Sequence, residues 1–319
     1  MLIQVGDKID RFHIQQHIAQ GGAASIFLAL DQMTGKQVAL KIPSQLSVGI
    51  PAPLERFRRE LEVMKTLDHP YIQKGVMSGQ FNQMPYLVTE WVNGRSMRDI
   101  VDEQAPMAPD KAIDIIRKLA EGMKYCHANG VIHRDLKPEN VLIQADGQPM
   151  ILDFGLALTK DAKRVTYANS TMMVGTPEYM SPEQCEGQRG GIRSDIYALG
   201  VMLYELLAGK TPFAGKTIMV VMAGHLQREV PQLDRKVPGL SPQLAAVVTK
   251  ALQKNPDDRY ANMDAFIEAL DQPDLSTVIP LDQTAGTVRK SPRWWSYGFM
   301  AVSLSLVTLI SILAIALGT

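Results

Sequence analysis

Hydrophobic and polar residues alternate in several stretches of the N-terminal part of the chain, as they do in β-strands. The clearest stretches are RFHIQQHIA (11–19), SIFLALDQ (25–32), QVALKI (37–42) and PYLVTEWV (85–92). Residues 53–67, PLERFRRELEVMKTL, instead have hydrophobic positions at helical spacing, and this pattern breaks at Pro70. The pattern predicts a small lobe over about residues 12–92, in which one helix packs on a twisted antiparallel sheet.

Helical spacing dominates the following part of the chain. The segments with this spacing are DKAIDIIRKLAEGMKYCHANG (110–130), IYALGVMLYELLAG (196–209), SPQLAAVVTKALQ (241–253) and NMDAFIEAL (262–270). The first two end on a glycine, a residue that commonly terminates helices. We therefore predict a larger, mainly helical lobe over about residues 93–270, and an α+β fold with two lobes over residues 12–270.

The hydrophobic pattern changes again near the C-terminus. Residues 271–296 are rich in Pro, Thr and Asp without a sustained period, which predicts a linker. Residues 297–317, YGFMAVSLSLVTLISILAIAL, carry no charge and can span the ~30 Å hydrocarbon core of a bilayer. Because basic residues and then Trp294 and Trp295 precede this run, we predict a transmembrane helix. The alternative is a buried C-terminal helix of a soluble domain.

Charge and cysteine content exclude some classes of function. The 33 Lys and Arg residues balance the 33 Asp and Glu residues, so the chain has no net attraction for polyanions and we expect no nucleic-acid partner. Cys126 and Cys185 lie far apart, without the spacing of a zinc site or a disulfide framework. No charged segment followed by an apolar run opens the chain, so no secretory signal peptide is expected.

Charged residues gather between hydrophobic segments at two places. HRDLKPEN (133–140) precedes a short apolar run, and Asp153 ends another. Asn140 and Asp153 provide oxygen ligands of the kind that Mg²⁺ accepts. Lys41 ends an apolar strand, where its ammonium group can neutralise phosphate charge, and Glu60 on the predicted helix is its candidate partner.

These residues belong to an ordered set of motifs. In chain order, the motifs are VALK (38–41), HRDLKPEN (133–140), DFG (153–155), GTPEYMSPE (175–183), SDIYALG (194–200) and NPDDRY (255–260). The set resembles a protein kinase of the bacterial eukaryotic-like (Hanks-type) serine/threonine type, over about residues 12–270. The resemblance implies the two-lobed kinase fold, with ATP and Mg²⁺ or Mn²⁺ used to phosphorylate Ser and Thr hydroxyls of proteins.

The resemblance also implies roles for the charged residues. Asp135 would accept the proton of the substrate hydroxyl or orient it, and Lys137 would stabilise the transferring phosphoryl group. Asn140 and Asp153 would hold the metal on the ATP phosphates. Other residues of the motifs would brace the fold. His133 would pack against Phe154, and Glu183 would pair with Arg259. Asp195 would hold the backbone of HRDLKPEN (133–140), here called the catalytic loop, and Thr176 would contact Asp135 and Lys137.

The implied ATP-binding pocket lies mainly in the small lobe. Lys41, paired with Glu60, would bind the α and β phosphates. Backbone groups of Glu90 and Val92 would contact the adenine edge, next to Thr89 as a small gatekeeper. The complete predicted set is Ile18, Ala19, Gln20, Gly21, Gly22, Ala23, Ala24, Ser25, Ile26, Ala39, Lys41, Glu90, Val92 and Leu142, in which Ala39 and Leu142 would sandwich the adenine ring.

The loop IAQGGAASIF (18–27) departs from the family's pattern. Ala19, Gly21 and Ala24 occupy the three positions where the family favours glycine. An alanine held at positive φ costs on the order of 1 kcal/mol, so we expect these alanines to weaken the phosphate clamp without removing it. On this account, Ala19→Gly should modestly improve ATP affinity.

The resemblance implies regulation as well. Arg134 precedes Asp135. In the family, the positive charge of an arginine at this position is usually neutralised by a phosphorylated residue between the DFG and SPE motifs. Thr166, Ser170 and Thr171 are the candidate autophosphorylation sites. Ser170 and Thr171 are favoured by their distance from Gly175.

The resemblance further predicts location and assembly. We expect a single-pass protein of the bacterial inner (cytoplasmic) membrane, with the kinase domain in the cytoplasm. Since the sequence ends at Thr319, the helix is expected to be a tail anchor without an extracellular domain. Kinase domains of this type commonly pair through their small lobes, so a homodimer through the N-lobe is also expected.

Two other functions remain alternatives. A pseudokinase would bind ATP or scaffold partners without transferring phosphate, and the unusual glycine loop is its support. The third interpretation is a kinase of the same fold that acts on a small molecule. The motif GTPEYMSPE disfavours it, because this motif resembles the peptide-docking segment of protein kinases.

Overall fold

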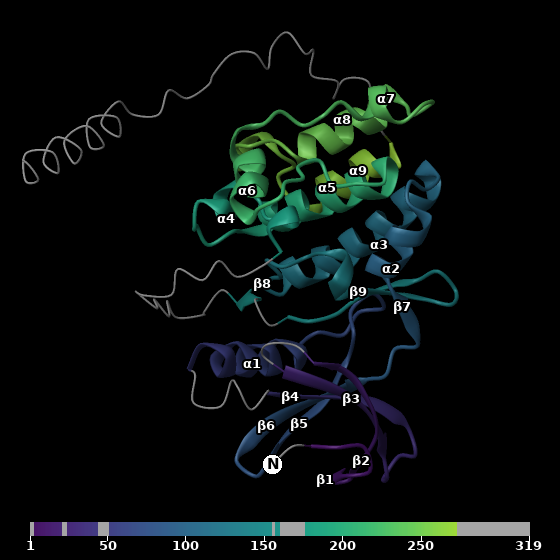
Figure 1. Ribbon diagram of the computed structural model, residues 1–319, viewed down its shortest axis with the longest axis vertical. Coiled ribbons are helices and arrows are strands. Elements are labelled where there is room, and N and C mark those ends of the chain that lie inside the picture. The colour runs from purple at the N-terminus through teal and green to yellow at the C-terminus, as the bar shows by residue number, and fades with distance from the viewer. Residues whose placement is uncertain (1–2, 21–23, 44–50, 155–156, 160–175, 273–319) are drawn as a thin grey trace, which may run out of the picture. The chain divides into compact units, whose positions relative to one another are not determined.

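The computed structural model describes residues 3–20, 24–43, 51–154, 157–159 and 176–272, which form a small and a large lobe (Figure 1). The predictions that lie outside these residues concern the linker and transmembrane helix (273–317), the loop tip (21–23) and the phosphorylation candidates Thr166, Ser170 and Thr171. In the ranges just given, no helix is long and apolar enough to cross a membrane.

The small lobe is built on one antiparallel sheet. Its strands are β1 (Lys8–Ile9), β2 (Phe12–Gln20), β3 (Ala24–Asp31), β4 (Gln37–Pro43), β5 (Gly75–Phe81) and β6 (Met84–Glu90). They lie in the order β1-β2-β3-β4-β6-β5, and helix α1 (Pro51–Met64) lies beside them (Figure 1). The predicted strands and helix are confirmed.

Two features of this sheet were not predicted. The sheet begins at Lys8 rather than near Phe12, because Lys8 and Ile9 pair with the start of β2 across a tight turn. The hydrophobic pattern does not predict strand β5, because its residues GVMSGQF are mostly half-buried and do not alternate between hydrophobic and polar. Strand β5 instead takes its place through hydrogen bonds to β6.

Strand β4 shows how alternation places the candidate lysine. Val38, Leu40 and Ile42 are buried in the core that the strands of the small lobe share. Because successive side chains of a strand point to opposite faces, Ala39 and Lys41 lie on the other face. The pattern therefore directs Lys41 away from this core and toward helix α1.

The large lobe is mainly helical, as predicted. Its helices are α2 (Met97–Gln104), α3 (Pro109–Ala128), α4 (Pro182–Cys185), α5 (Ile192–Ala208), α6 (Ile218–Gln227), α7 (Leu233–Lys236), α8 (Pro242–Ala251) and α9 (Met263–Asp271). Helix α5 is buried along almost its whole length and packs on α3 and α8, while α3 also packs on α9. At the end of α5, Gly209 takes the predicted terminating role with φ 73°.

Short elements complete the large lobe. They are β7 (Gly94–Ser96), β8 (Val131–Ile132), β9 (Val141–Gln144), β10 (Pro149–Ile151), β11 (Leu158–Thr159) and the 3₁₀ turns η2 (Pro138–Asn140), η3 (Pro177–Tyr179) and η4 (Pro256–Asp258). Strands β10, β9 and β7 form one small sheet, and β11 pairs with β8. The pattern did not predict α2, which is short, or α6, whose sequence IMVVMAGHLQ lacks a continuous polar face.

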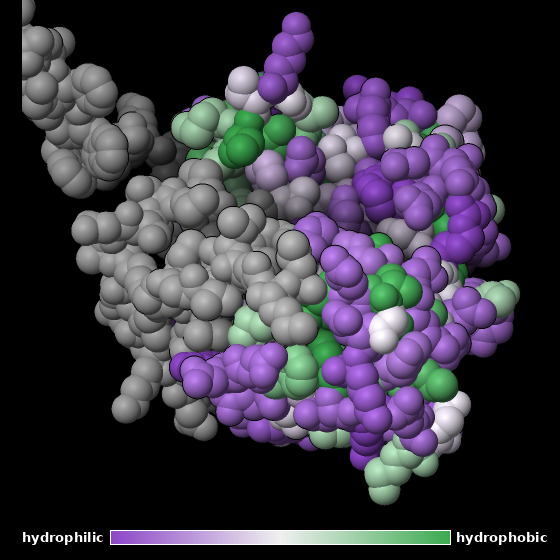
Figure 2. Space-filling view, turned by 60° about the horizontal axis from the view of Figure 1, so that its bottom comes forward, coloured by the Kyte–Doolittle hydropathy of each residue, from purple (hydrophilic) through white to green (hydrophobic). Residues whose placement is uncertain are grey.

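The described residues on the face shown in Figure 2 are mainly hydrophilic, and hydrophobic residues occur among them in small separate groups. Large hydrophobic residues with high exposure include Met33 and Val76 on the small lobe and Ile218 and Met219 on α6. Scattered exposed apolar residues are ordinary on protein surfaces, so most of these require no special explanation.

Arg259 braces the large lobe as predicted. Its buried guanidinium donates to both carboxylate oxygens of Glu183, at 2.9 and 2.7 Å. It also donates to the backbone carbonyls of Arg193, Gln253 and Lys254. One side chain therefore connects the α4 region with the segment that follows α8.

We expect Arg259→Met to lower the free energy of unfolding by about 3–5 kcal/mol, because it leaves the largely buried Glu183 carboxylate without its cation. Urea denaturation of the full chain measures this loss. Arg193→Met is the matched control, since it removes a surface ion pair with Asp257 and should cost less than about 1 kcal/mol. Equal losses in the two variants would show that the buried pair does not brace the lobe.

Candidate active site

Lys41 is the centre of a charge cluster. Its Nζ lies 2.7 Å from Glu60 Oε1 on α1 and 3.1 Å from Asp153 Oδ1, which follows β10. The predicted pairing of Lys41 with Glu60 is therefore present, and Asp153 adds a second carboxylate that the sequence pattern did not predict as a partner. Helix α1 and strand β4 of the small lobe are thereby connected to the large lobe.

The charges of this cluster depend on one another. Burial opposes the charge of Lys41, but Glu60 and Asp153 outweigh it and raise the pKa of the lysine above its ordinary value. Burial raises the pKa of the Glu60 carboxyl to about 7; Lys41 opposes this shift and Asp153 adds to it. Lys41 is therefore held as a cation, and that cation stabilises the ionised form of Glu60.

The catalytic loop follows β8 and brings its polar side chains together. Lys137 Nζ lies 3.1 Å from Asp135 Oδ2 and donates to Thr176 Oγ1 at 2.8 Å. Asn140 Nδ2 donates to the backbone carbonyl of Asp135 at 2.8 Å. Three residues of one short motif and Thr176 thus form a connected group, in which Thr176 reaches Lys137 as predicted.

Asp195 supports this loop from the start of α5. Its carboxylate accepts hydrogen bonds from the backbone N–H groups of His133, at 3.0 Å, and Arg134, at 2.8 Å. It also contacts His127 Nε2 at 2.8 Å. Arg134 has φ 70°, a conformation that costs energy for a non-glycine residue, and the Asp195 bonds help to hold it. The predicted tie between Asp195 and the catalytic-loop backbone is confirmed.

Asp153 and Asn140 lie on adjoining segments. The backbone N–H of Leu152 donates to the carbonyl of Asn140 at 2.8 Å, which places Asp153 next to the catalytic loop. The Asp153 carboxylate is 47% exposed, and Asp153 has φ 55°. Next to it, buried Phe154 packs on His133, with ring centroids 4.9 Å apart, as predicted.

The donor atoms of Asn140 and Asp153 fit the predicted metal. Both residues offer hard oxygen atoms, which Mg²⁺ prefers. The Asn140 amide nitrogen already donates to Asp135, so its oxygen is the atom left for a cation. The exposed Asp153 carboxylate would be the second oxygen ligand of such an ion.

The register of the small sheet places several predicted ATP-binding residues on one face. Lys41 lies opposite Ile26 on β3 and opposite Leu87 on β6. Ala39 lies opposite Thr89. Directly opposed residues of antiparallel strands share a face, so Ile26, Ala39, Lys41 and Thr89 line the same side of the sheet.

The predicted pocket residues that remain outside the β2–β3 hairpin are Glu90, Val92 and Leu142. Val92 is buried in the segment after β6. The carbonyl of Glu90 accepts a hydrogen bond from Gln73 Nε2 at 3.0 Å, and a carbonyl oxygen has a second lone pair available for an adenine amino group. Leu142 lies on β9 of the large lobe.

The loop between β2 and β3 is a hairpin whose arms the structure describes. Ala19 lies opposite Ile26, and Gln20 lies opposite Ser25, whose hydroxyl donates to Gln20 Oε1 at 2.9 Å. Ile18 is half-exposed on β2 and Ala24 is buried at the start of β3. Residues 21–23 at the tip are outside the described ranges.

The proposed strain at Ala19 and Ala24 is a prediction that the structure contradicts. The non-glycine residues with positive φ in the described ranges are Asp10, Asn82, Gln83, Arg134 and Asp153, so neither alanine is among them. Both alanines lie in paired strands, where the extended backbone suits any side chain.

We therefore expect Ala19→Gly to leave ATP affinity within about twofold of the unmodified chain, because glycine relieves no left-handed strain there and adds flexibility to the strand. Titration with a fluorescent ATP analogue measures the affinity. A clear gain in affinity would show instead that the Ala19 methyl obstructs the phosphates.

One polar cluster near this site was not predicted from the sequence. Arg98 on α2, Tyr179 in η3 and Glu205 on α5 are joined by hydrogen bonds. Glu205 is the one charged residue in IYALGVMLYELLAG, and a lone carboxylate inside an apolar helix is a signal that a cation must lie nearby.

Comparisons with known proteins agree with this architecture. The protein kinase domain family matches residues 12–271. The chain is 34% identical over 284 residues to the probable serine/threonine-protein kinase PknB of Lactococcus lactis, covering 88% of this chain and 44% of that protein. It is 36% identical over 255 residues to the serine/threonine-protein kinase PknB of Mycolicibacterium smegmatis, covering 79% of this chain and 41% of that protein.

A probable serine/threonine-protein kinase of Corynebacterium efficiens is 37% identical over 273 residues, covering 82% of this chain and 41% of that protein. The chain thus spans less than half the length of these relatives. The region matched by the family contains every motif described above and, apart from β1, the helices and strands of both lobes. The chain belongs to the protein kinase family, in its bacterial eukaryotic-like (Hanks-type) serine/threonine branch.

Proposed function

We propose that this chain is an active protein kinase that transfers the γ-phosphoryl group of ATP to Ser and Thr hydroxyls of proteins. The observation that carries the proposal is the assembled charge cluster, in which Lys41 contacts both Glu60 and Asp153. The relatives in Lactococcus lactis and Mycolicibacterium smegmatis are named as serine/threonine-protein kinases, which supports the same activity.

Each residue of the site has a definite task in this reaction. Lys41 binds the α and β phosphates, held in place by Glu60. Asp135 orients the acceptor hydroxyl and takes its proton as the oxygen–phosphorus bond forms and the bond to the ADP leaving group breaks. Lys137, beside Asp135, stabilises the charge of the transferring group.

Asn140 and Asp153 would hold Mg²⁺ or Mn²⁺, which when bound neutralises negative charge on the phosphates. Their oxygen donors suit this ion, and Asp153 also contacts Lys41, so the same carboxylate would serve both the metal and the lysine.

Incubation of the full chain with labelled ATP, either metal ion and a generic basic protein tests the activity. Phosphate on Ser or Thr of the added protein is the expected result. ATP binding without transfer would favour the pseudokinase interpretation. Transfer to small molecules alone would favour the third interpretation.

We also propose that the chain phosphorylates its own segment between DFG and SPE, at Thr166, Ser170 or Thr171. These residues lie outside the described ranges. The support comes from Arg134: its partly buried guanidinium lies near Arg59 and Arg189, and a phosphorylated residue would neutralise this positive charge. Mass spectrometry of protein incubated with ATP identifies the modified residue.

For the location, we propose that residues 297–317 anchor the kinase domain at the cytoplasmic face of the bacterial inner membrane. The uncharged length of this run and the basic residues before it support the proposal. A reporter that is active only in the periplasm, fused after Thr319, should be active. An inactive reporter together with a soluble chain would contradict it.

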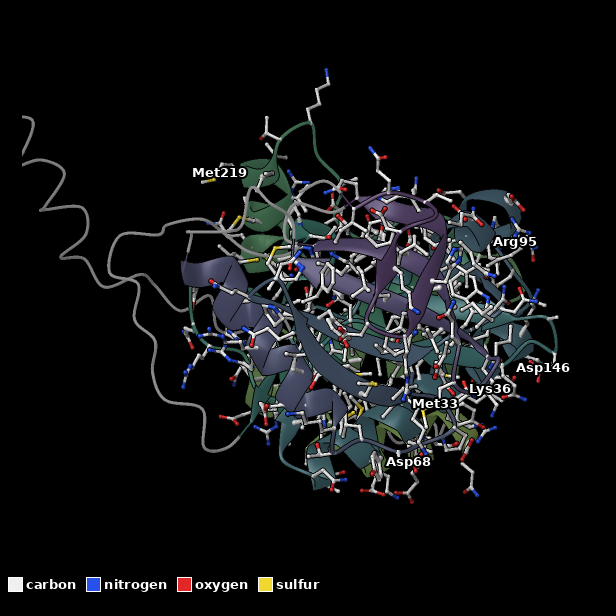
Figure 3. The ribbon with its side chains drawn as sticks, turned by 90° about the horizontal axis from the view of Figure 1, so that it is seen from below. Met33, Lys36, Asp68, Arg95, Asp146 and Met219 are labelled. Atoms are coloured by element: carbon white, nitrogen blue, oxygen red, sulfur yellow. The ribbon has the colours of Figure 1, made fainter. Side chains whose placement is uncertain are left out.

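We propose further that two copies pair through their small lobes. Support comes from Met33, which is 77% exposed in the turn between β3 and β4 and is seen from below in Figure 3. Analytical ultracentrifugation of the unmodified chain and of Met33→Asp tests this pairing, and a dimer that Met33→Asp leaves intact would place the interface elsewhere.

A further inference from the structure

Arg98, Tyr179 and Glu205 form a closed ring of hydrogen bonds, here called the Arg98 cluster. Arg98 Nη1 donates to the Tyr179 hydroxyl at 2.9 Å and to Glu205 Oε1 at 3.0 Å. The Tyr179 hydroxyl donates to Glu205 Oε2 at 2.6 Å. The cluster thus joins helices α2 and α5 to the turn η3.

Burial explains why these side chains need one another. The Glu205 side chain is only 7% exposed and lies among apolar residues in the C-terminal half of α5, where an unpaired carboxylate is costly. Arg98 supplies the compensating charge, and Tyr179 satisfies the second carboxylate oxygen. Burial, together with Glu205, raises the pKa of Tyr179 above its ordinary value, so its hydroxyl remains a donor.

The position of Tyr179 is therefore decided by two helices of the large lobe. Arg98 is itself held at the start of α2, where its backbone N–H donates to Ser96 Oγ at 3.1 Å. Asp102, one turn along the same helix, contacts the outer edge of the guanidinium. The start of α2 thus fixes the backbone of Arg98, while Tyr179 and Glu205 hold its Nη1 group.

A single turn connects Tyr179 with the catalytic loop. Its backbone N–H donates to the carbonyl of Thr176 at 3.2 Å. Thr176 Oγ1 in turn accepts from Lys137 Nζ at 2.8 Å, and Lys137 contacts Asp135. A displacement of Tyr179 must therefore also displace Lys137 and Asp135, the residues proposed to act on the acceptor hydroxyl.

We propose that Arg98 is a positioning residue for the protein acceptor: with Glu205 it anchors Tyr179, and thereby holds residues 176–181 against the catalytic loop. This inference rests on the proposed kinase activity. The inference predicts that loss of the cluster affects the acceptor and not ATP. Lys41 and Glu60, which bind or support ATP, lie on β4 and α1, whereas the cluster lies on other elements. Acceptor use should depend on the cluster, and ATP use should not.

Steady-state kinetics of the full chain, with ATP and a basic protein acceptor varied in turn, test this selectivity. Arg98→Met and Tyr179→Phe should lower kcat/KM for the acceptor by roughly 10- to 100-fold, since small displacements at a reacting group have such effects. The KM for ATP should stay within about twofold in both variants. Arg98→Lys should recover part of the loss, because it restores the positive charge.

Asp102→Asn is the matched control. Asp102 binds the same guanidinium but is 63% exposed and does not contact Tyr179 or Glu205, so its loss should leave acceptor kinetics within about twofold. Tyr179→Phe keeps the buried ring and is expected to remain folded, so it decides the question if Arg98→Met does not fold.

Three outcomes would overturn the inference. An unmodified chain that phosphorylates no acceptor overturns the proposed function and this inference with it. An active unmodified chain whose Arg98→Met and Tyr179→Phe variants keep acceptor kcat/KM within twofold overturns the inference alone. A fall in kcat that matches the fraction of unfolded protein seen in a thermal melt would indicate a loss of folded protein rather than of positioning, and also counts against it.

Discussion

Asp135→Asn will lose phosphoryl transfer by a factor of roughly 10² to 10⁴, the range expected when a general base is removed. Asparagine has nearly the same shape, so the backbone carbonyl of residue 135 can still accept the hydrogen bond from Asn140. It cannot take the hydroxyl proton, however, and it loses the charge that attracts Lys137. ATP affinity should change little, because Lys41 and Glu60 are untouched.

Two measurements check this result. Transfer of labelled phosphate to a basic protein gives the loss of rate, and mass spectrometry should find no phosphate within residues 160–175 of the variant made in a phosphatase-free host. Asp146→Asn is the control, since Asp146 is an exposed loop residue whose carboxylate only caps the N–H of Gln148. A phosphorylated segment in the Asp135→Asn protein would disprove autophosphorylation as its source.

Lys41→Met should reduce kcat/KM for ATP by roughly 10²- to 10³-fold, the loss typical of removing one preorganised electrostatic contact from a reacting group. Methionine fills a similar volume but carries no charge, so the phosphates lose a ligand. The buried Glu60 also loses its cation, and because burial raises its pKa, it should then take up a proton at neutral pH. Helix α1 would no longer be held to the site by charge.

Kinetics with varied ATP give the activity loss, and thermal melting shows whether the domain remains folded. Lys36→Met is the matched control, because Lys36 lies in the exposed turn before the same strand (Figure 3). Full activity in Lys41→Met would contradict the assignment of Lys41 to the phosphates. A loss of similar size in Lys36→Met would point to general damage instead.

Much of the catalytic loop could be predicted because its residues are close together in the sequence. Asp135, Lys137 and Asn140 belong to one motif and contact one another directly. The position of Lys41 was also accessible, because the alternation of β4 alone sends it to the face opposite Val38 and Leu40.

Local conformation was harder to predict from residue type. The expectation that Ala19 and Ala24 are strained assumed a left-handed backbone, whereas the strand pairing of β2 with β3 keeps both extended. Conversely, positive φ occurs at Arg134 and Asp153, where the sequence offers no glycine to indicate it. Hydrogen bonds from elsewhere in the fold hold such residues, so their strain is not a local property.

The sequence by itself determined the family, the two lobes, the order of the main elements and the residues of the catalytic motifs, because periodicity and motifs are properties of neighbouring residues. Only the tertiary structure decided that Asp153 contacts Lys41 across 112 positions of the chain, and that Arg98 contacts Glu205 across 107. Such pairs form when packing buries charges that must find partners, and sequence spacing carries no record of which distant residue that partner is.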